Sequence, residues 1–169
     1  MFKSIECMNV FRRDEGDAAI VIVSGLPRSG TSMMMRMLSM GGIEPLTDGI
    51  REKNSRNPHG YFEWEPVKKC ASYAEWMPRA EGRALKVVSR FLPYLPATHR
   101  YDVVFLHRSL DDVVRSQADM ARHHSDAAWD AASTERLKTA YRCHVEETLA
   151  WIEKRPNMRI QELRYDDVI

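Results

Sequence analysis

A glycine-bearing loop near the start of the chain has the residues needed to bind an anion. Gly25 and Gly30 are separated by four residues, and Arg28 lies between them. The backbone N–H groups of such a loop can surround a phosphate, and a helix that follows it directly adds about half a positive charge. The Arg28 guanidinium can bind two oxygens of the same anion. The loop therefore predicts a phosphate or sulfate site.

The residues after the second glycine differ from those in the loop of most nucleoside triphosphatases. In those proteins a lysine follows the second glycine, whereas this chain has Thr31 and then Ser32. The available cation is Arg28, inside the loop. The alternative interpretation is a strand-to-helix turn that binds nothing, since glycine-bearing turns are common.

A second cation follows a buried-strand pattern later in the chain. Arg108 comes shortly after the apolar segment 103–106, where an enzyme that uses Mg-ATP often has an acidic residue. Ser116 and Ser109 are seven residues apart, so Ser116 lies on the helical face that begins beside Arg108. We expect both side chains to reach one small anion. The alternative is that Arg108 forms a surface ion pair with Asp111 or Asp112.

The expected secondary structure places both motifs at the same edge of a sheet. Strands are predicted at 19–23, 84–89, 101–107 and 158–163. Helices are predicted from Thr31 to about Met40, from Pro66 to Trp76, from Leu110, and from Ser125 or Ser133 to the residues before Pro156.

This alternation predicts an α/β fold with three layers, α/β/α, around a central parallel sheet of about four to five strands, of the P-loop nucleotide-binding type. Ligands of such sheets bind at the carboxyl ends of the strands. We expect one domain over residues 1–169, with a leading arm at 1–17 and a substrate loop at 44–64.

The composition excludes several classes of partner. A formal net charge of +1 gives no global attraction to nucleic acid or to an anionic membrane. Three scattered cysteines fit neither a disulfide framework nor a zinc site, and they indicate a reducing compartment. The longest apolar stretch is too short to span a bilayer, and no signal-peptide pattern is present. The chain is predicted to be cytoplasmic, and it carries no signal for an oligomeric state.

The two motifs resemble a known family. Pro27-Arg28-Ser29-Gly30-Thr31-Ser32 resembles the 5′-phosphosulfate loop of sulfotransferases that use 3′-phosphoadenosine 5′-phosphosulfate (PAPS). Arg108-x3-Asp112-Val113-x2-Ser116 resembles their 3′-phosphate motif, with the same spacing from arginine to serine. Segments 85–88 and 164–167 also fall where the family has recurrent sequence. The resemblance covers about residues 19–169 and is that of a small bacterial-type or truncated member.

The resemblance assigns roles to particular residues. It implies that the 5′-phosphosulfate is held by Arg28, Ser29, Gly30, Thr31 and Ser32, and the 3′-phosphate by Arg108 and Ser116. It implies metal-independent, in-line transfer from the co-substrate PAPS to a hydroxyl or amine of a small-molecule, lipid or glycan acceptor. Arg28 and Lys86 would neutralise charge on the leaving oxygen, so no metal is expected.

Some positions depart from the family pattern. Met33 stands where many members have a tryptophan, and Val88 stands where the cytosolic branch has a catalytic histidine. The predicted base is Glu63, in an acidic-aromatic segment that resembles one in the glycan-sulfating branch. The alternative is that the aromatic residues there are core anchors and that the neighbouring carboxylates are solvated.

Two other functions remain open at this point. The missing histidine is compatible with a catalytically impaired nucleotide-binding protein that keeps the fold. An ATP-dependent small-molecule kinase is the third possibility. The absence of a loop lysine and of an acidic residue after the third predicted strand counts against it.

Overall fold

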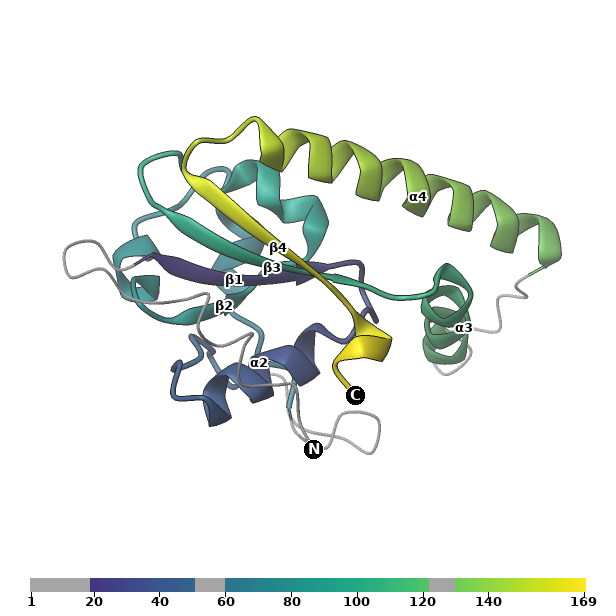
Figure 1. The fold of residues 1–169 in the computed structure, drawn as a ribbon, viewed down its shortest axis with the longest axis horizontal. Coiled ribbons are helices and arrows are strands. Elements are labelled where there is room, and N and C mark those ends of the chain that lie inside the picture. The colour runs from purple at the N-terminus through teal and green to yellow at the C-terminus, as the bar shows by residue number, and fades with distance from the viewer. Residues whose placement is uncertain (1–18, 51–59, 122–129) are drawn as a thin grey trace.

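The computed structural model describes residues 19–50, 60–121 and 130–169. Its centre is a four-stranded sheet in which all neighbouring strands are parallel, in the order β2-β1-β3-β4 (Figure 1). The strands are β1 (Ile20–Gly25), β2 (Ala84–Lys86), β3 (Tyr101–His107) and β4 (Met158–Arg164). The predicted α/β fold with a parallel sheet is confirmed for the described part of the chain.

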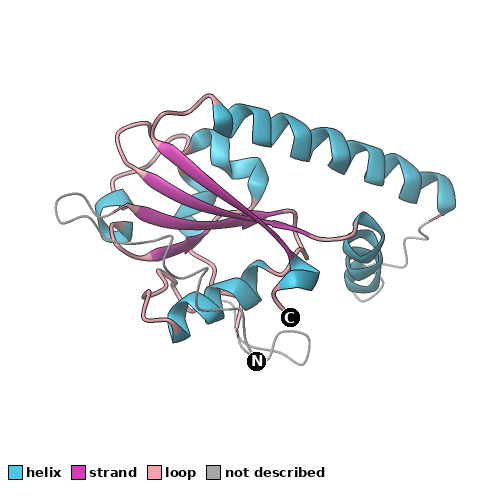
Figure 2. Cartoon of the chain, in the orientation of Figure 1, coloured by secondary structure: helices cyan, strands magenta, loops and turns pink. Residues whose placement is uncertain are grey.

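Helices cover both faces of the sheet (Figure 2). On one face, α2 (Thr31–Met40) packs its apolar side chains against the odd-numbered residues Val21 and Val23 of β1. On the other face, α4 (Ala131–Glu153) and three short 3-10 helices pack against Ile20 and Ile22. The 3-10 helices are η2 (Glu65–Lys69), η3 (Met77–Ala80) and η4 (Ser89–Tyr94). Every residue of β1 is buried, as expected for a central parallel strand with helices on both sides.

The last residues of the chain and the helix that follows β3 lie at one end of this sheet. α3 (Leu110–Ala121) begins three residues after β3 and lies next to the start of α4 in Figure 1. β4 leads directly into the short helix η5 (Tyr165–Asp167). Both connections start at carboxyl ends of strands, which is where the sequence analysis places a ligand.

Two predicted elements are wrong in extent. The helix predicted over Pro66–Trp76 is only the short η2, followed by turns. The N–H groups of Cys70 and Ser72 bond to carbonyls only three residues back, those of Val67 at 3.2 Å and of Lys69 at 2.9 Å. The strand predicted over 84–89 ends at Lys86. After one more ladder bond, from the Val87 N–H to the Val23 carbonyl, the chain turns into η4.

The start of α4 also differs from the prediction. The side chain of Asp130 accepts a hydrogen bond from the backbone N–H of Ser133 at 2.6 Å, so Asp130 is the N-cap and Ser133 lies inside the first turn. Ser125 lies outside the described residues, as does the leading arm at 1–17. The helix Thr31–Met40 and the strand Tyr101–His107 are confirmed, and β4 extends the predicted strand by one residue.

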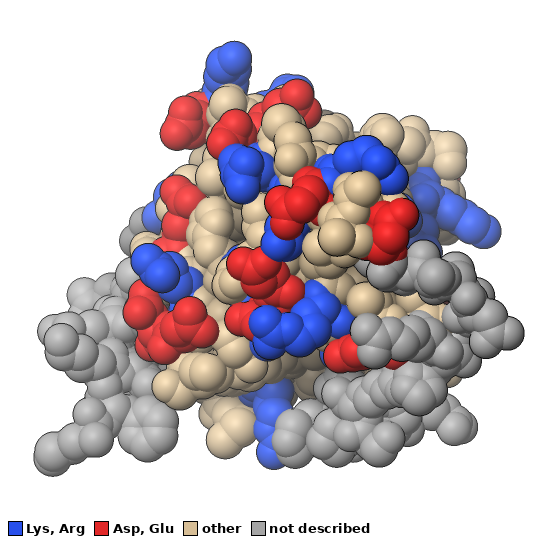
Figure 3. Space-filling view, turned by 90° about the vertical axis from the view of Figure 1, so that its right-hand side faces the viewer, with Lys and Arg blue, Asp and Glu red and all other residues tan. Residues whose placement is uncertain are grey.

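The described surface shows no concentration of one charge on the face that includes α3. In Figure 3, lysine and arginine side chains are interspersed with acidic ones over the described part of that face, as expected from a net charge near zero. Among the helices of the described ranges, none combines the length and the apolar character needed to cross a bilayer.

Tyr101 gives a test of the buried end of β3. Its side chain is 1% exposed, and its hydroxyl donates a hydrogen bond to the Pro96 carbonyl at 2.8 Å. Burial raises the pKa of Tyr101, and the nearby Cys70 thiolate raises it further. Because the folded-state pKa is raised, the resulting stability is present below the unfolded-state pKa of about 10 and is lost as the pH rises above it.

We expect the free energy of unfolding of the wild-type protein to fall between about pH 9 and about pH 11, and the fall to be smaller in Tyr101→Phe. Urea unfolding at several pH values measures both curves. The substitution itself costs about 1 kcal/mol at neutral pH because the hydrogen bond is lost. If the free energy of unfolding falls equally with pH in the wild-type protein and in Tyr101→Phe, then the Tyr101 hydroxyl is not buried in its uncharged form.

Candidate functional site

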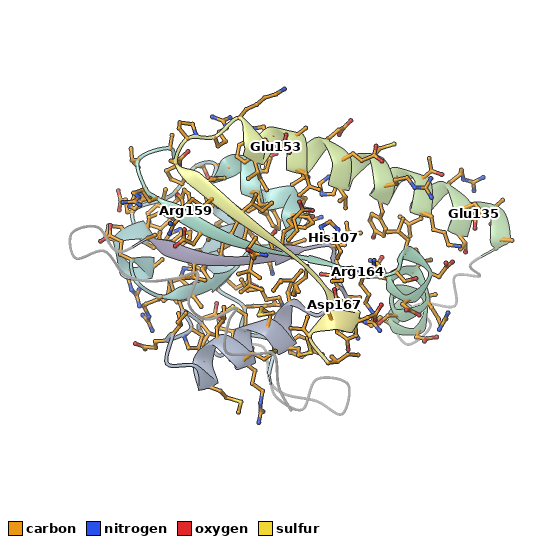
Figure 4. All side chains as sticks on the ribbon, viewed as in Figure 1. His107, Glu135, Glu153, Arg159, Arg164 and Asp167 are labelled. Atoms are coloured by element: carbon orange, nitrogen blue, oxygen red, sulfur yellow. The ribbon has the colours of Figure 1, made fainter. Side chains whose placement is uncertain are left out.

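The residues singled out from the sequence lie at the carboxyl edge of the sheet. Gly25 at the end of β1 pairs with Leu106 of β3, and His107 pairs with Arg164 of β4. Lys86, the last residue of β2, pairs with Val23. His107, Arg164 and Asp167 are labelled at this edge, beside α3, in Figure 4. The fold therefore brings four strand ends and the β1–α2 loop (Leu26–Gly30) together.

The backbone of the β1–α2 loop is closely packed at its two glycines. A Cβ atom on Gly25 would lie 2.6 Å from the Leu106 carbonyl oxygen. A Cβ atom on Gly30 would lie 2.5 Å from the ring of Tyr165, and Gly30 has a φ of 98°. Arg28 has a φ of 73°, a conformation that costs a non-glycine residue about 1–3 kcal/mol and persists only where the surroundings fix it. The loop is thus held in one shape.

The two predicted phosphate motifs are in direct contact. The Arg28 Nε donates a hydrogen bond to the Ser116 Oγ at 2.8 Å, across 88 residues of sequence. The Arg108 Nη1 donates to the Arg28 carbonyl oxygen at 3.0 Å. The first contact joins the loop to the second turn of α3, and the second joins the residue after β3 to the loop. The three segments therefore form a single cluster.

The acidic residues near Arg108 have other partners. Asp112 forms an ion pair with Arg115 at 3.1 Å, and Asp111 pairs with Lys138 of α4. The Lys138 ammonium also lowers the pKa of Asp111, chiefly through their hydrogen bond. The alternative interpretation, in which Arg108 pairs with one of these carboxylates, is therefore wrong.

Arg28 and Arg108 keep their positive charge uncompensated. Within the described residues, neither guanidinium forms an ion pair with a carboxylate, and their partners are a hydroxyl, a carbonyl and an aromatic ring. The ring belongs to Tyr165, whose centroid lies 4.4 Å from the Arg108 Cζ. The two half-buried cations are held by the same cluster, and an anion bound there would offset their repulsion. The geometry can therefore bind a phosphate or sulfate group.

Lys86 brings a third cation to the start of α2. Its Nζ donates to the Ser32 Oγ at 3.0 Å and to the Tyr61 carbonyl at 2.9 Å. Strand alternation places Lys86 on the α2 face of the sheet, because it pairs with Val23, which packs against α2. Lys86 thus contacts the residue that the resemblance assigns to the 5′-phosphosulfate.

The remaining predicted loop residues are buried beneath the loop. Ser29 is 1% exposed and Thr31 is 6% exposed. The Ser29 hydroxyl is buried and has no hydrogen-bond partner among the described residues. An unsatisfied buried hydroxyl costs stability. This hydroxyl faces the end of β1, since a Cβ atom on Gly25 would lie 2.5 Å from the Ser29 Oγ.

The position of Glu63 is defined by its backbone. Its carbonyl accepts hydrogen bonds from the Thr47 Oγ1 at 3.0 Å and from the Asp48 N–H at 3.1 Å, which joins the two described parts of the predicted substrate loop. These contacts assign no role to the carboxylate, so Glu63 as the base stays a prediction. Tyr61 and Trp64 pack into or against the core, as the alternative interpretation of that segment expects.

Sequence reasoning missed three residues that hold the loop. Tyr165 packs its ring against Gly30 and Arg108. The Gln117 Nε2 donates to the Pro27 carbonyl at 3.3 Å, and the Tyr141 hydroxyl donates to the Gln117 Oε1 at 2.7 Å. The recurrent segment 164–167 was a signal for Tyr165. The hydrogen bond between Tyr141 and Gln117 has no signal in the sequence. The two residues are 24 positions apart on different helices, and no motif has that spacing.

Comparisons with known proteins assign no function to this chain. No protein-family model matches the chain, and no curated protein matches its sequence. The residues described above are therefore the basis for assigning a function.

Gly30→Ala tests the packing of Tyr165 on the loop. We expect it to lower the free energy of unfolding by about 2 kcal/mol or more, because the new methyl group meets the Tyr165 ring and the positive φ is strained. Gly42→Ala is the matched control, since Gly42 has a φ of 89° and nothing lies within 4 Å of its Cβ position. Urea unfolding measures both variants. Equal losses in the two would contradict the close contact at Gly30.

Proposed function

We propose that the chain is a sulfotransferase that moves a sulfuryl group from PAPS to a hydroxyl or amine acceptor. The observation that carries the proposal is the contact of two motifs, each resembling one phosphate site of that family, through Arg28, Ser116 and Arg108. The uncompensated charge of the two arginines supports the binding of an anion with more than one negative group. The proposal includes a P-loop type of nucleotide site and a cytoplasmic location.

The β1–α2 loop would hold the 5′-phosphosulfate. The positive end of α2 and the Arg28 side chain would bind its oxygens, and the orphaned Ser29 hydroxyl lies buried in the same loop. Ser32 is assigned to the same group and is already bonded to Lys86. Arg108 and Ser116 would hold the 3′-phosphate, and Tyr165 would keep the Arg108 guanidinium in place by stacking on it.

Catalysis in this proposal is positioning and charge neutralisation. Transfer of a sulfuryl group develops negative charge on the oxygen that leaves sulfur. Lys86 and Arg28 would neutralise this charge, and the fixed loop would keep the donor in line with the acceptor. A small molecule, a lipid and a glycan remain the acceptor classes, because residues 44–50 and 60–64 form only part of the predicted substrate loop.

Arg108→Ala tests the 3′-phosphate site. By calorimetric titration, we expect 3′,5′-ADP without metal to bind the wild-type protein more tightly than 5′-AMP or Mg-ATP does. Because a hydrogen bond to a charged group contributes about 1.5–3 kcal/mol, Arg108→Ala should weaken 3′,5′-ADP binding by about 10-fold to 150-fold and leave 5′-AMP binding little changed. The control is Arg115→Ala, at a residue whose side chain is 70% exposed and pairs with Asp112.

The other outcomes of this titration point to the other functions. Equal or tighter binding of Mg-ATP would contradict the sulfotransferase and favour a kinase. Failure to bind any of the three nucleotides would favour a protein that keeps the fold without the site.

Lys86→Met tests the charge at the start of α2. We expect release of 3′,5′-ADP from PAPS to slow by about 100-fold or more, because one charge on the leaving group is no longer neutralised. The affinity for 3′,5′-ADP should also fall, by about 10-fold to 150-fold, because its 5′-phosphate keeps the leaving oxygen and the charge on it. Lys68→Met is the control, at an exposed lysine that pairs with Glu65. A rate in Lys86→Met equal to that of the Lys68→Met control would contradict the role of Lys86 in neutralising the leaving oxygen.

A further inference from the structure

A histidine from α4 reaches the segment that follows Lys86. The His144 Nε2 lies 2.8 Å from the Ser89 Oγ, at the first residue of η4. Ser89 is 1% exposed and comes three residues after Lys86, whereas His144 is only half-buried. Within the described residues, the Nδ1 of His144 makes no hydrogen bond, so one ring nitrogen is held and the other is available.

The same face of α4 also reaches the β1–α2 loop. Tyr141 precedes His144 by three residues, so the two side chains lie on one side of the helix. Tyr141 is linked through Gln117 to the Pro27 carbonyl, beside Arg28. His144 therefore lies on the helical face that is linked through Gln117 to the loop and bonded directly to η4. The proposed function assigns the loop to the phosphosulfate, and η4 begins three residues after Lys86.

We infer that His144 is the base that removes the proton from the acceptor. This inference rests on the proposed function and replaces Glu63 in that role. With its hydrogen on Nε2, the ring donates to the Ser89 Oγ and carries a lone pair on Nδ1. The imidazole on α4 would thus provide the proton acceptor that the aliphatic side chain of Val88 cannot provide.

The step balances without another reactant. His144 Nδ1 takes the proton of the acceptor O–H or N–H while that oxygen or nitrogen forms a bond to sulfur. The bond between sulfur and the bridging oxygen of the 5′-phosphate breaks, and 3′,5′-ADP leaves with the electron pair. The proton stays on the imidazole, whose positive charge is stabilised by the Ser89 oxygen until water removes the proton.

A purely structural role for the pair predicts different behaviour. In that case the hydrogen bond would only fasten α4 to η4, and any side chain that keeps this bond would serve. His144→Gln separates the two roles, because its amide can still donate to the Ser89 Oγ but cannot take a proton at working pH. Thermal unfolding of His144→Ala and His144→Gln reports on the structural contribution.

The test measures release of 3′,5′-ADP from PAPS by the full-length chain. The acceptors are water, a phenol, an aliphatic alcohol and a primary amine, each in a separate assay. We expect His144→Ala and His144→Gln to lower kcat by about 100-fold or more and to keep the 3′,5′-ADP affinity within about threefold. Free imidazole should restore part of the kcat of His144→Ala. The control is His99→Ala, at a histidine on the opposite end of β3 that faces Glu81 at 3.6 Å.

The outcomes separate this inference from the proposed function. Wild-type turnover by His144→Gln, or loss of turnover in Glu63→Gln alone, would overturn His144 as the base and leave the sulfotransferase in place. A wild-type protein that binds 3′,5′-ADP but transfers to none of these acceptors would also overturn it. Failure of the wild-type protein to bind 3′,5′-ADP would instead overturn the proposed function.

Discussion

The organisation of this molecule depends on two arginines that are held together with no acidic partner among residues 19–50, 60–121 and 130–169. Arg28 donates to Ser116, and Arg108 donates to the carbonyl of Arg28, so the contacts that fix the two guanidinium groups are with neutral oxygens of the described residues. The repulsion between two like charges in one cluster is offset when an anion binds beside them. The acidic side chains of α3 that lie nearby are paired with Arg115 and Lys138. We therefore propose that the site binds a ligand that brings negative charge.

The sheet and its helices provide the rigid support for this charge. Parallel pairing aligns the carboxyl ends of β1, β3 and β4, which fixes the β1–α2 loop against the backbone of Leu106 and against the ring of Tyr165. α3 supplies Ser116 and Gln117, and α4 reaches the same region through Tyr141. Because each of these contacts joins segments that are far apart in sequence, the geometry of the site depends on the complete fold. A site on a rigid scaffold of this kind loses little free energy to ordering when the ligand binds.

Short sequence patterns were enough to predict the helices and strands whose local preference matches their position in the fold. The helix Thr31–Met40 follows a glycine and ends before two glycines, and the strand Tyr101–His107 contains the apolar run 103–106, so both have the predicted bounds. The helix predicted over Pro66–Trp76 is wrong because the N–H groups of Cys70 and Ser72 bond to carbonyls only three residues back. The spacing of the two phosphate motifs was readable, since each is short. Their direct contact, and the ring that packs on both, arise from tertiary structure and have no local pattern.

We propose that one nucleotide with phosphates at both its 3′ and 5′ positions spans this edge of the sheet. The most direct test is a crystal structure of the protein with 3′,5′-ADP. We expect the 5′-phosphate on the backbone N–H groups of the β1–α2 loop, and the 3′-phosphate on the Arg108 guanidinium and the Ser116 hydroxyl. A nucleotide bound elsewhere on the protein, or bound here with its 3′-phosphate away from Arg108, would show that the two motifs do not form one nucleotide site.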